Sequence, residues 1–142
     1  MKDDRLRVPI DDPYLHALGL ALVCFARLEW DAVGCCEKMR PGYTESLKRK
    51  TAGEIAADLV ELAAAHSDPA IVASLSPAAI EFQRLAKIRN ALMHAKPGTA
   101  PNGDQRLFRD GDEWTIAKID DAADAFSANS CDLNKHLHHV LK

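Results

Sequence analysis

Hydrophobic positions recur every three or four residues along most of this chain, which is the spacing of amphipathic helices. The first such segment starts at Asp12-Pro13, a typical helix start, and continues without a breaker to Pro41-Gly42. Its expected inward stripe comprises Leu18, Leu22, Phe25, Val33 and Cys36. The stretch from Leu18 to Ala26 is apolar on all sides, which predicts a helix buried in the middle of a bundle.

Three more helices are predicted further along the chain. Thr51 and Glu54 have the spacing of a capping box, so they predict a second helix start. Ser76-Pro77 predicts the start of a third helix that continues to about Ala95, with an apolar stripe of Phe82, Leu85, Ile88, Leu92 and Ala95. Asp120 or Asp121 predicts the start of the last helix, with an inward stripe of Phe126, Leu133, Leu137 and Val140.

The segment between the last two helices has a different composition. Residues 96–104 have the residue types of a loop. The segments 106–109 and 113–116 flank Asp110-Gly111, a pair that favours the tight turn of a small β-hairpin. We therefore predict an all-α fold, an antiparallel four- or five-helix bundle, with room for a hairpin after the third helix.

Composition supports one helical domain over residues 1–142. Hydrophobic residues make up 47% of the 142 residues, which is enough for one core, whereas only 6% are aromatic. The glycines and prolines lie mostly between the periodic segments, as expected for helices joined by short loops.

Candidate chemistry is concentrated near the end of the third predicted helix. Asn90 and His94 lie four residues apart on one stripe, roughly opposite the apolar face, and Arg89 lies to the side, about 7.5 Å along the axis from His94. A titratable imidazole, a fixed cation and an amide suit phosphodiester cleavage, because a hydroxyl must lose a proton and a phosphorane needs positive charge. This chemistry requires no metal and no cofactor.

A structural alternative exists for the same residues. His94 and Lys96 fall in the predicted last turn, where cations complement the helix dipole, and Pro97-Gly98 is an ordinary helix stop. Asn90 would then be a surface residue.

The segment Arg89-Asn90-Ala91-Leu92-Met93-His94 resembles the motif of HEPN domains: arginine, a polar residue, three more residues, then histidine near the end of a bundle helix. The order of helices also resembles that family across nearly the whole chain. This resemblance implies a metal-independent ribonuclease or RNA-binding module, usually a homodimer that brings two copies of the motif together. Many relatives in that family have no demonstrated activity.

The net charge of −3 does not favour binding of a polyanion, so contact with RNA would need a local basic surface. Basic residues surround the motif and extend into the hairpin: Arg84, Lys87, Lys96, Arg106 and Arg109. We expect these to contact phosphate; the alternative is a solvated charged face. Glu29 interrupts the apolar stripe of the first helix and is a candidate to orient Arg89, although it could equally lie at the helix edge without that partner.

The remaining polar signals are weaker. Asp132, His136 and His139 could share a face and bind zinc or nickel weakly, although basic side chains at a helix end more often complement its dipole. Four cysteines without metal-ligand spacing are expected to be reduced and mostly buried. The charged segment 1–7 does not resemble a secretory signal, and nine apolar residues cannot span a bilayer, so we expect a cytoplasmic protein without a membrane segment.

The function that these observations favour is a metal-independent endoribonuclease with a composite site in a homodimer. In it, His94 is the acid or base, Arg89 stabilises the phosphorane, and Asn90 orients the imidazole or the phosphate. A second hypothesis is a non-catalytic module that binds a nucleotide, RNA or a protein partner such as a nucleotidyltransferase or an antitoxin. In a third hypothesis, the motif only stabilises a structural dimer.

Overall fold

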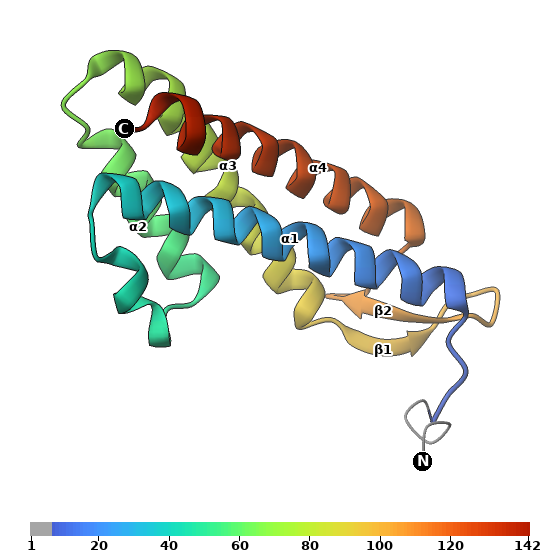
Figure 1. The fold of residues 1–142 in the computed structure, drawn as a ribbon. Helices are drawn as coiled ribbons and strands as arrows, with labels where there is room; N and C mark the ends of the chain where they lie inside the picture. The colour runs from blue at the N-terminus through green and yellow to red at the C-terminus, as the bar shows by residue number, and fades with distance from the viewer. Residues whose placement is uncertain (1–6) are drawn as a thin grey trace.

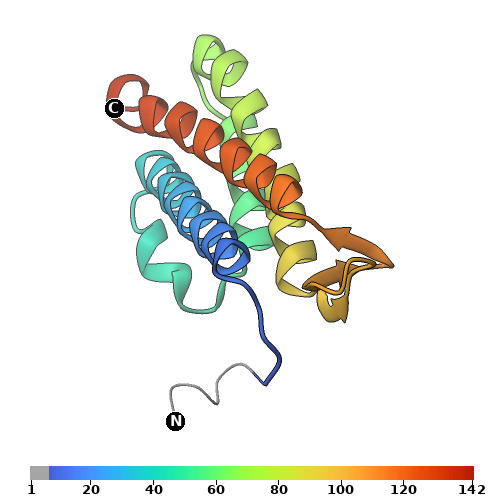
Figure 2. The same cartoon turned by 90° about the vertical axis from the view of Figure 1, so that its right-hand side faces the viewer.

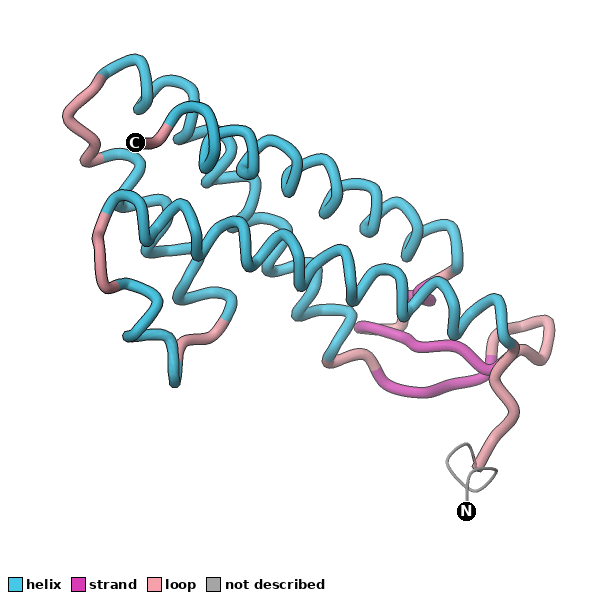
Figure 3. Tube along the Cα trace, viewed as in Figure 1, coloured by secondary structure: helices cyan, strands magenta, loops and turns pink. Residues whose placement is uncertain are grey.

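The computed structural model describes residues 7–142; residues 1–6, most of the charged segment at the start of the sequence, lie outside the described residues. The helices are α1 Asp12–Met39, the 3-10 helix η2 Tyr43–Arg49, α2 Ala52–Ala64, α3 Pro69–Met93, α4 Ile116–Lys135 and the π-helical turn η3 His136–Val140 (Figure 1). Strands β1 Lys96–Thr99, β2 Gln105–Arg109 and β3 Asp112–Trp114 form a small sheet between α3 and α4 (Figure 3). The fold is mostly helical, as predicted.

The predicted starts of the first two long helices are confirmed. The Asp11 side chain accepts a hydrogen bond from the Tyr14 N–H and so caps α1, and Pro13 occupies its first turn. At the start of α2, Thr51 and Glu54 form the complete capping box.

The predicted start of α3 at Ser76-Pro77 is wrong. Asp68 caps the helix by accepting from the Ala70 N–H at 2.9 Å, and Pro69 occupies the first turn. Pro77 therefore lies inside α3, although a proline removes one hydrogen bond of the helix. The residues beside it, Leu75 and Ala78, are buried in the core, and this packing holds the helix across the proline.

The last long helix also begins earlier than predicted. Thr115 accepts a hydrogen bond from the Lys118 N–H, so α4 begins at Ile116, four residues before Asp120. Ile119, in the first turn, is fully buried. Packing of this turn thus extends α4 towards the sheet.

Helices α1 and α4 run in the same direction, side by side, and α3 runs opposite to both (Figures 1 and 2). Contacts along α1 and α4 keep the same order, since Tyr14 bonds to Trp114 just before α4 while Cys35 bonds to Leu133 near its end. The predicted antiparallel arrangement thus describes α3 relative to these two helices, but not α1 relative to α4.

The core joins these three helices through aromatic rings. The Phe25 ring of α1 stacks on Phe82 of α3 with centroids 6.1 Å apart and meets Phe126 of α4 edge-on at 5.1 Å. The buried stripe of α1 also contains the large residues Tyr14 and Leu28 and the small residues Ala17, Ala21 and Ala32, which let the neighbouring helices approach closely.

The prediction that Leu18 to Ala26 is buried on all sides is wrong in this chain. Leu20, Leu22 and Val23 are 46%, 52% and 57% exposed, and Trp30 is 64% exposed. The apolar surface of α1 is wider than the surface that α3 and α4 cover, so a second apolar stripe stays exposed.

The hairpin at Asp110-Gly111 is confirmed, with positive φ angles of 52° and 84° at these residues, as a tight turn requires. Residues 96–99, predicted as loop, instead form β1, which pairs with β2. Its sequence contains a proline and a glycine and has no strand pattern, so only the partner strand reveals it. No helix within residues 7–142 is both long enough and apolar enough to cross a membrane.

Candidate functional site

The motif lies at the carboxyl end of α3, where the chain turns into the sheet. His94 is exposed and ends the helix, with its N–H bonded to the Asn90 carbonyl oxygen at 3.0 Å. Lys96 follows as the first residue of β1, beside Phe108 of β2. The imidazole is therefore accessible to a ligand, on a backbone fixed by a helix end and a strand.

Arg89 lies between this helix end and the core. Its Nη1 donates to the Asn90 Oδ1 at 2.9 Å, and its guanidinium lies over the Phe25 ring at 5.1 Å from the centroid. The Nε is buried and has no hydrogen-bond partner. Among residues 7–142, no carboxylate forms an ion pair with Arg89, so none of these residues neutralises its charge through such a pair.

The orientation of Arg89 thus comes from different groups than predicted. Glu29 is half-buried on α1, but within the described part of the chain it forms no ion pair with Arg89. Phe25, one helical turn earlier on α1, and Asn90 provide the contacts instead. An aromatic face and an amide hold a guanidinium without cancelling its charge.

Of the basic residues predicted near the motif, three remain close to it and accessible. Lys87 and Lys96 are exposed, and neither forms an ion pair in residues 7–142. Arg109, at the end of β2, approaches the His94 carbonyl oxygen at 3.5 Å and lies 3.7 Å from the carboxylate of Asp110. These three residues form a small basic surface around the motif.

Arg84, one helical turn before Ile88, is engaged by a carboxylate. Two hydrogen bonds of 2.6 and 2.8 Å join it to Glu81 on the same helix. Through these bonds the pKa of Glu81 is lowered and that of Arg84 is raised. Arg84 therefore adds less to the basic surface than the sequence suggested.

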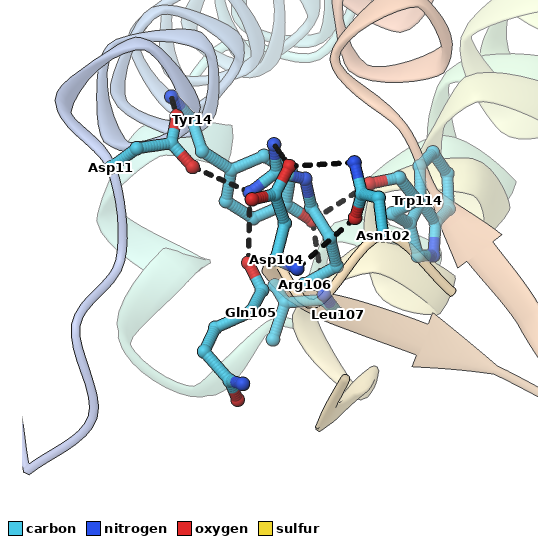
Figure 4. Close-up of polar contacts among 8 residues, drawn as sticks. All are labelled: Asp11, Tyr14, Asn102, Asp104, Gln105, Arg106, Leu107 and Trp114. Carbon is cyan, nitrogen blue, oxygen red and sulfur yellow. Dashed lines mark hydrogen bonds and ion pairs between the residues drawn. The ribbon is translucent and has the colours of Figure 1, made fainter. Parts of the chain in front are cut away.

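The contacts of Arg106 stabilise the fold and do not leave its guanidinium free for a ligand (Figure 4). Its guanidinium pairs with Asp11 at 2.6 Å and Asp104 at 3.3 Å, and it lies over the Tyr14 ring at 4.4 Å. The Arg106 side chain is only 10% exposed. Its hydrogen bond lowers the pKa of Asp11 and raises its own pKa. Arg106 thus fastens β2 to the start of α1 and is already neutralised.

The polar residues near the end of α4 do not converge on one point. His136 is buried, its Nδ1 lies 3.3 Å from an Asp132 carboxylate oxygen, and its Nε2 lies 3.2 Å from the Ser74 Oγ of α3. His139 lines a groove beside α1 instead. Within residues 7–142, no three His, Cys, Asp or Glu side chains are placed to hold a metal ion.

All four cysteines are free. Burial raises the pKa of Cys35 and of Cys36 to about 12, so neither thiol forms the reactive thiolate near neutral pH. Cys131 is exposed and Cys24 half-buried, and both line the groove beside α1.

That groove was not predicted from the sequence. It lies between α1 and α4, has a volume of about 1050 Å³, and is lined on the α1 side by Leu20, Val23 and Trp30. A sequence signal for it exists, because Leu20, Val23, Arg27 and Trp30 repeat every three or four residues beside the buried stripe.

A scan against known protein families and searches among characterised proteins and solved structures found no match for this chain.

Proposed function

We propose that this chain is a metal-independent endoribonuclease of HEPN type, built on a helical bundle and acting in the cytoplasm. The observation that carries the proposal is that Arg89 forms no ion pair with a carboxylate of residues 7–142. Arg84, Arg106 and Arg109 each have a carboxylate within 4.0 Å, whereas Arg89 has none among residues 7–142. An anionic ligand such as a phosphodiester is favoured by a partly buried guanidinium that pairs with no carboxylate of residues 7–142 and that lies five residues before the exposed His94.

In this proposal His94 transfers protons and Arg89 stabilises charge. An imidazole removes the proton of an RNA 2'-hydroxyl, the resulting oxygen attacks the adjacent phosphorus, and the bond to the 5'-oxygen breaks. The guanidinium stabilises the extra negative charge of the phosphorane, and Asn90 holds that guanidinium through its Oδ1. The products are a 2',3'-cyclic phosphate and a 5'-hydroxyl end.

A second imidazole must protonate the leaving oxygen, and we propose that a second copy of the chain supplies it. Contact between two α3 helices about a two-fold axis would place two His94 and two Arg89 side chains at one cleft. The exposure of His94 and of the neighbouring Met93, which is 55% exposed, supports contact at this end of α3.

The test is cleavage of a mixed RNA pool by the purified protein in EDTA, beside His94→Ala. We expect the variant to lose activity by about 10²- to 10⁴-fold, with unchanged circular dichroism because the side chain is exposed. Lys38→Ala, which removes an exposed cation in the last turn of α1, at the end of the bundle away from the motif, controls for general loss of charge. Full activity in His94→Ala would end the catalytic proposal.

A second function, a non-catalytic binding module, is favoured by the neutralisation of Arg84 and Arg106. This leaves a smaller basic surface for RNA on a chain with net charge −3. The partner would be a nucleotide, RNA or a protein such as an antitoxin or a nucleotidyltransferase. In the cleavage assay such a module would leave the RNA intact. It would bind its ligand equally well with His94 or with alanine at that position.

A further inference from the structure

The groove between α1 and α4 is hollow because the two helices contribute side chains of different size. The large apolar residues of its lining, Leu20, Val23 and Trp30, come from α1, whereas α4 contributes the small residues Ser127, Ser130 and Cys131 and the polar Asn134 and Lys135. The groove lies away from α3, because Phe25, on the core side of α1, stacks on Phe82 of α3 and meets Phe126 of α4 edge-on. This surface is therefore separate from the motif.

The spacing of the lining residues is that of a helix-packing seam. On α1, Leu20, Val23, Arg27 and Trp30 lie three, four and three residues apart, and on α4, Ser127, Cys131 and Asn134 lie four and three residues apart. This is the a and d spacing of coiled coils, along which a further helix packs. From Leu20 to Trp30 the seam is about 15 Å long, nearly three helical turns.

The charge around the groove is opposite to that of the chain as a whole. Arg27 and Lys135 line it, and neither forms an ion pair within residues 7–142. Among the described lining residues Asp31 is the single carboxylate, and it already accepts hydrogen bonds from Ser130 at 2.5 Å and Asn134 at 3.1 Å. The groove is thus locally basic on a chain with net charge −3.

We propose that the α1–α4 groove binds an acidic amphipathic helix of a protein partner. The apolar face of that helix packs on Leu20, Val23 and Trp30, and carboxylates on its flanks pair with Arg27 and Lys135. A second copy of the chain fits less well, because its own groove presents the same two cations and its Asp31 is already engaged. A bilayer fits less well because the surface is concave.

The test uses a synthetic helical peptide of about 20 residues with leucines at a and d and glutamates at the flanking e and g positions. The control peptide carries lysines in place of the glutamates. Titration calorimetry with the whole protein should show saturable binding of the acidic peptide and at least about tenfold weaker binding of the basic one. Arg27→Glu with Lys135→Glu should reverse that preference.

A matched pair of variants tests the site. Val23 in the groove and Ile80 on α3 are each 57% exposed, so glutamate at either position disturbs the fold to a similar extent. Val23→Glu should abolish binding of the acidic peptide, whereas Ile80→Glu should retain it. His94→Ala should bind as the wild type does, which separates this proposal from the ribonuclease.

Several results would overturn the proposal. These are absence of saturable binding, equal binding of the two peptides, and equal effects of Val23→Glu and Ile80→Glu. Conversion of a dimer to a monomer by Val23→Glu alone would assign the groove to a second copy. Binding of zwitterionic vesicles that depends on Val23 would assign it to a membrane.

Discussion

Tyr14, in the first turn of α1, donates a hydrogen bond of 2.7 Å to the carbonyl oxygen of Trp114, one hundred residues later at the end of β3. The same hydroxyl accepts from the Leu107 N–H of β2 at 3.0 Å. One buried phenol thus bonds to two strands and, together with the pair of Arg106 and Asp11, it links the start of α1 to the sheet (Figure 4).

Tyr14→Phe should therefore lower stability, because the ring still fits while two partly buried backbone groups lose their hydrogen-bond partner. We expect a loss of about 1–3 kcal/mol in the free energy of unfolding, measured by urea denaturation. Faster hydrogen exchange of the Leu107 amide would localise the effect. An unchanged exchange rate at Leu107 would show that water replaces the hydroxyl.

The ion pair of Asp11 with Arg106 should make stability depend on pH. The hydrogen bond from Arg106 lowers the pKa of Asp11 below its unfolded value, so its stabilisation is complete above about pH 4 and is lost as pH falls through the folded pKa. Asp11→Asn retains the helix cap and removes the charge. The difference in unfolding free energy between the two proteins should be largest near pH 7 and should shrink below about pH 4. A constant difference would exclude the pair as its source.

Arg89→Met should separate function from stability. Methionine keeps the apolar packing on Phe25 and removes a buried Nε that has no partner, so stability should stay within about 1 kcal/mol of the wild type, or rise. RNA cleavage should fall to background. Arg84→Met, which breaks only the exposed pair with Glu81, is the control and should retain activity. Destabilisation by more than about 2 kcal/mol in Arg89→Met would indicate a structural role for Arg89.

Gly98 is required by the close approach of Phe108. A Cβ at position 98 would lie 2.7 and 2.8 Å from two ring carbons of Phe108, so Gly98→Ala must displace the ring or the strand. We expect a loss of about 1–3 kcal/mol in thermal or urea unfolding. Gly53→Ala, in the first turn of α2, meets no atom closer than 3.9 Å and should be neutral or stabilising. Equal effects at both positions would refute the steric argument.

The parts of the fold that the sequence predicts are those encoded by neighbouring residues. The caps of α1 and α2 and the turn at Asp110-Gly111 each depend on groups within three residues of one another. The start of α3 was misplaced because two similar signals, Asp68-Pro69 and Ser76-Pro77, lie eight residues apart. Only the burial of the turns around Pro77 decides between them.

In the candidate site, too, the contacts between neighbouring residues could be predicted from the sequence, and the others could not. Adjacent positions on one helix bring Arg89 to Asn90, and the pair of Arg84 with Glu81 is also within reach of sequence spacing. The contact of Arg106 with Asp11 spans 95 residues, and the stacking of Arg89 on Phe25 joins two helices, so neither has a local signal. Whether a given arginine is paired with a carboxylate thus depends on tertiary contacts that the local sequence does not reveal.

The parallel pairing of α1 and α4 has a consequence for biosynthesis. This is the most extensive helix contact in residues 7–142, yet its bonds join residues 98 and 99 positions apart. A ribosome adds roughly 5–20 residues per second, so α1 waits on the order of 5–20 s for α4 to leave the exit tunnel. During that interval the Phe25 ring lacks its contact with Phe126 of α4, and the nascent chain depends on α2, α3 or a chaperone to prevent aggregation.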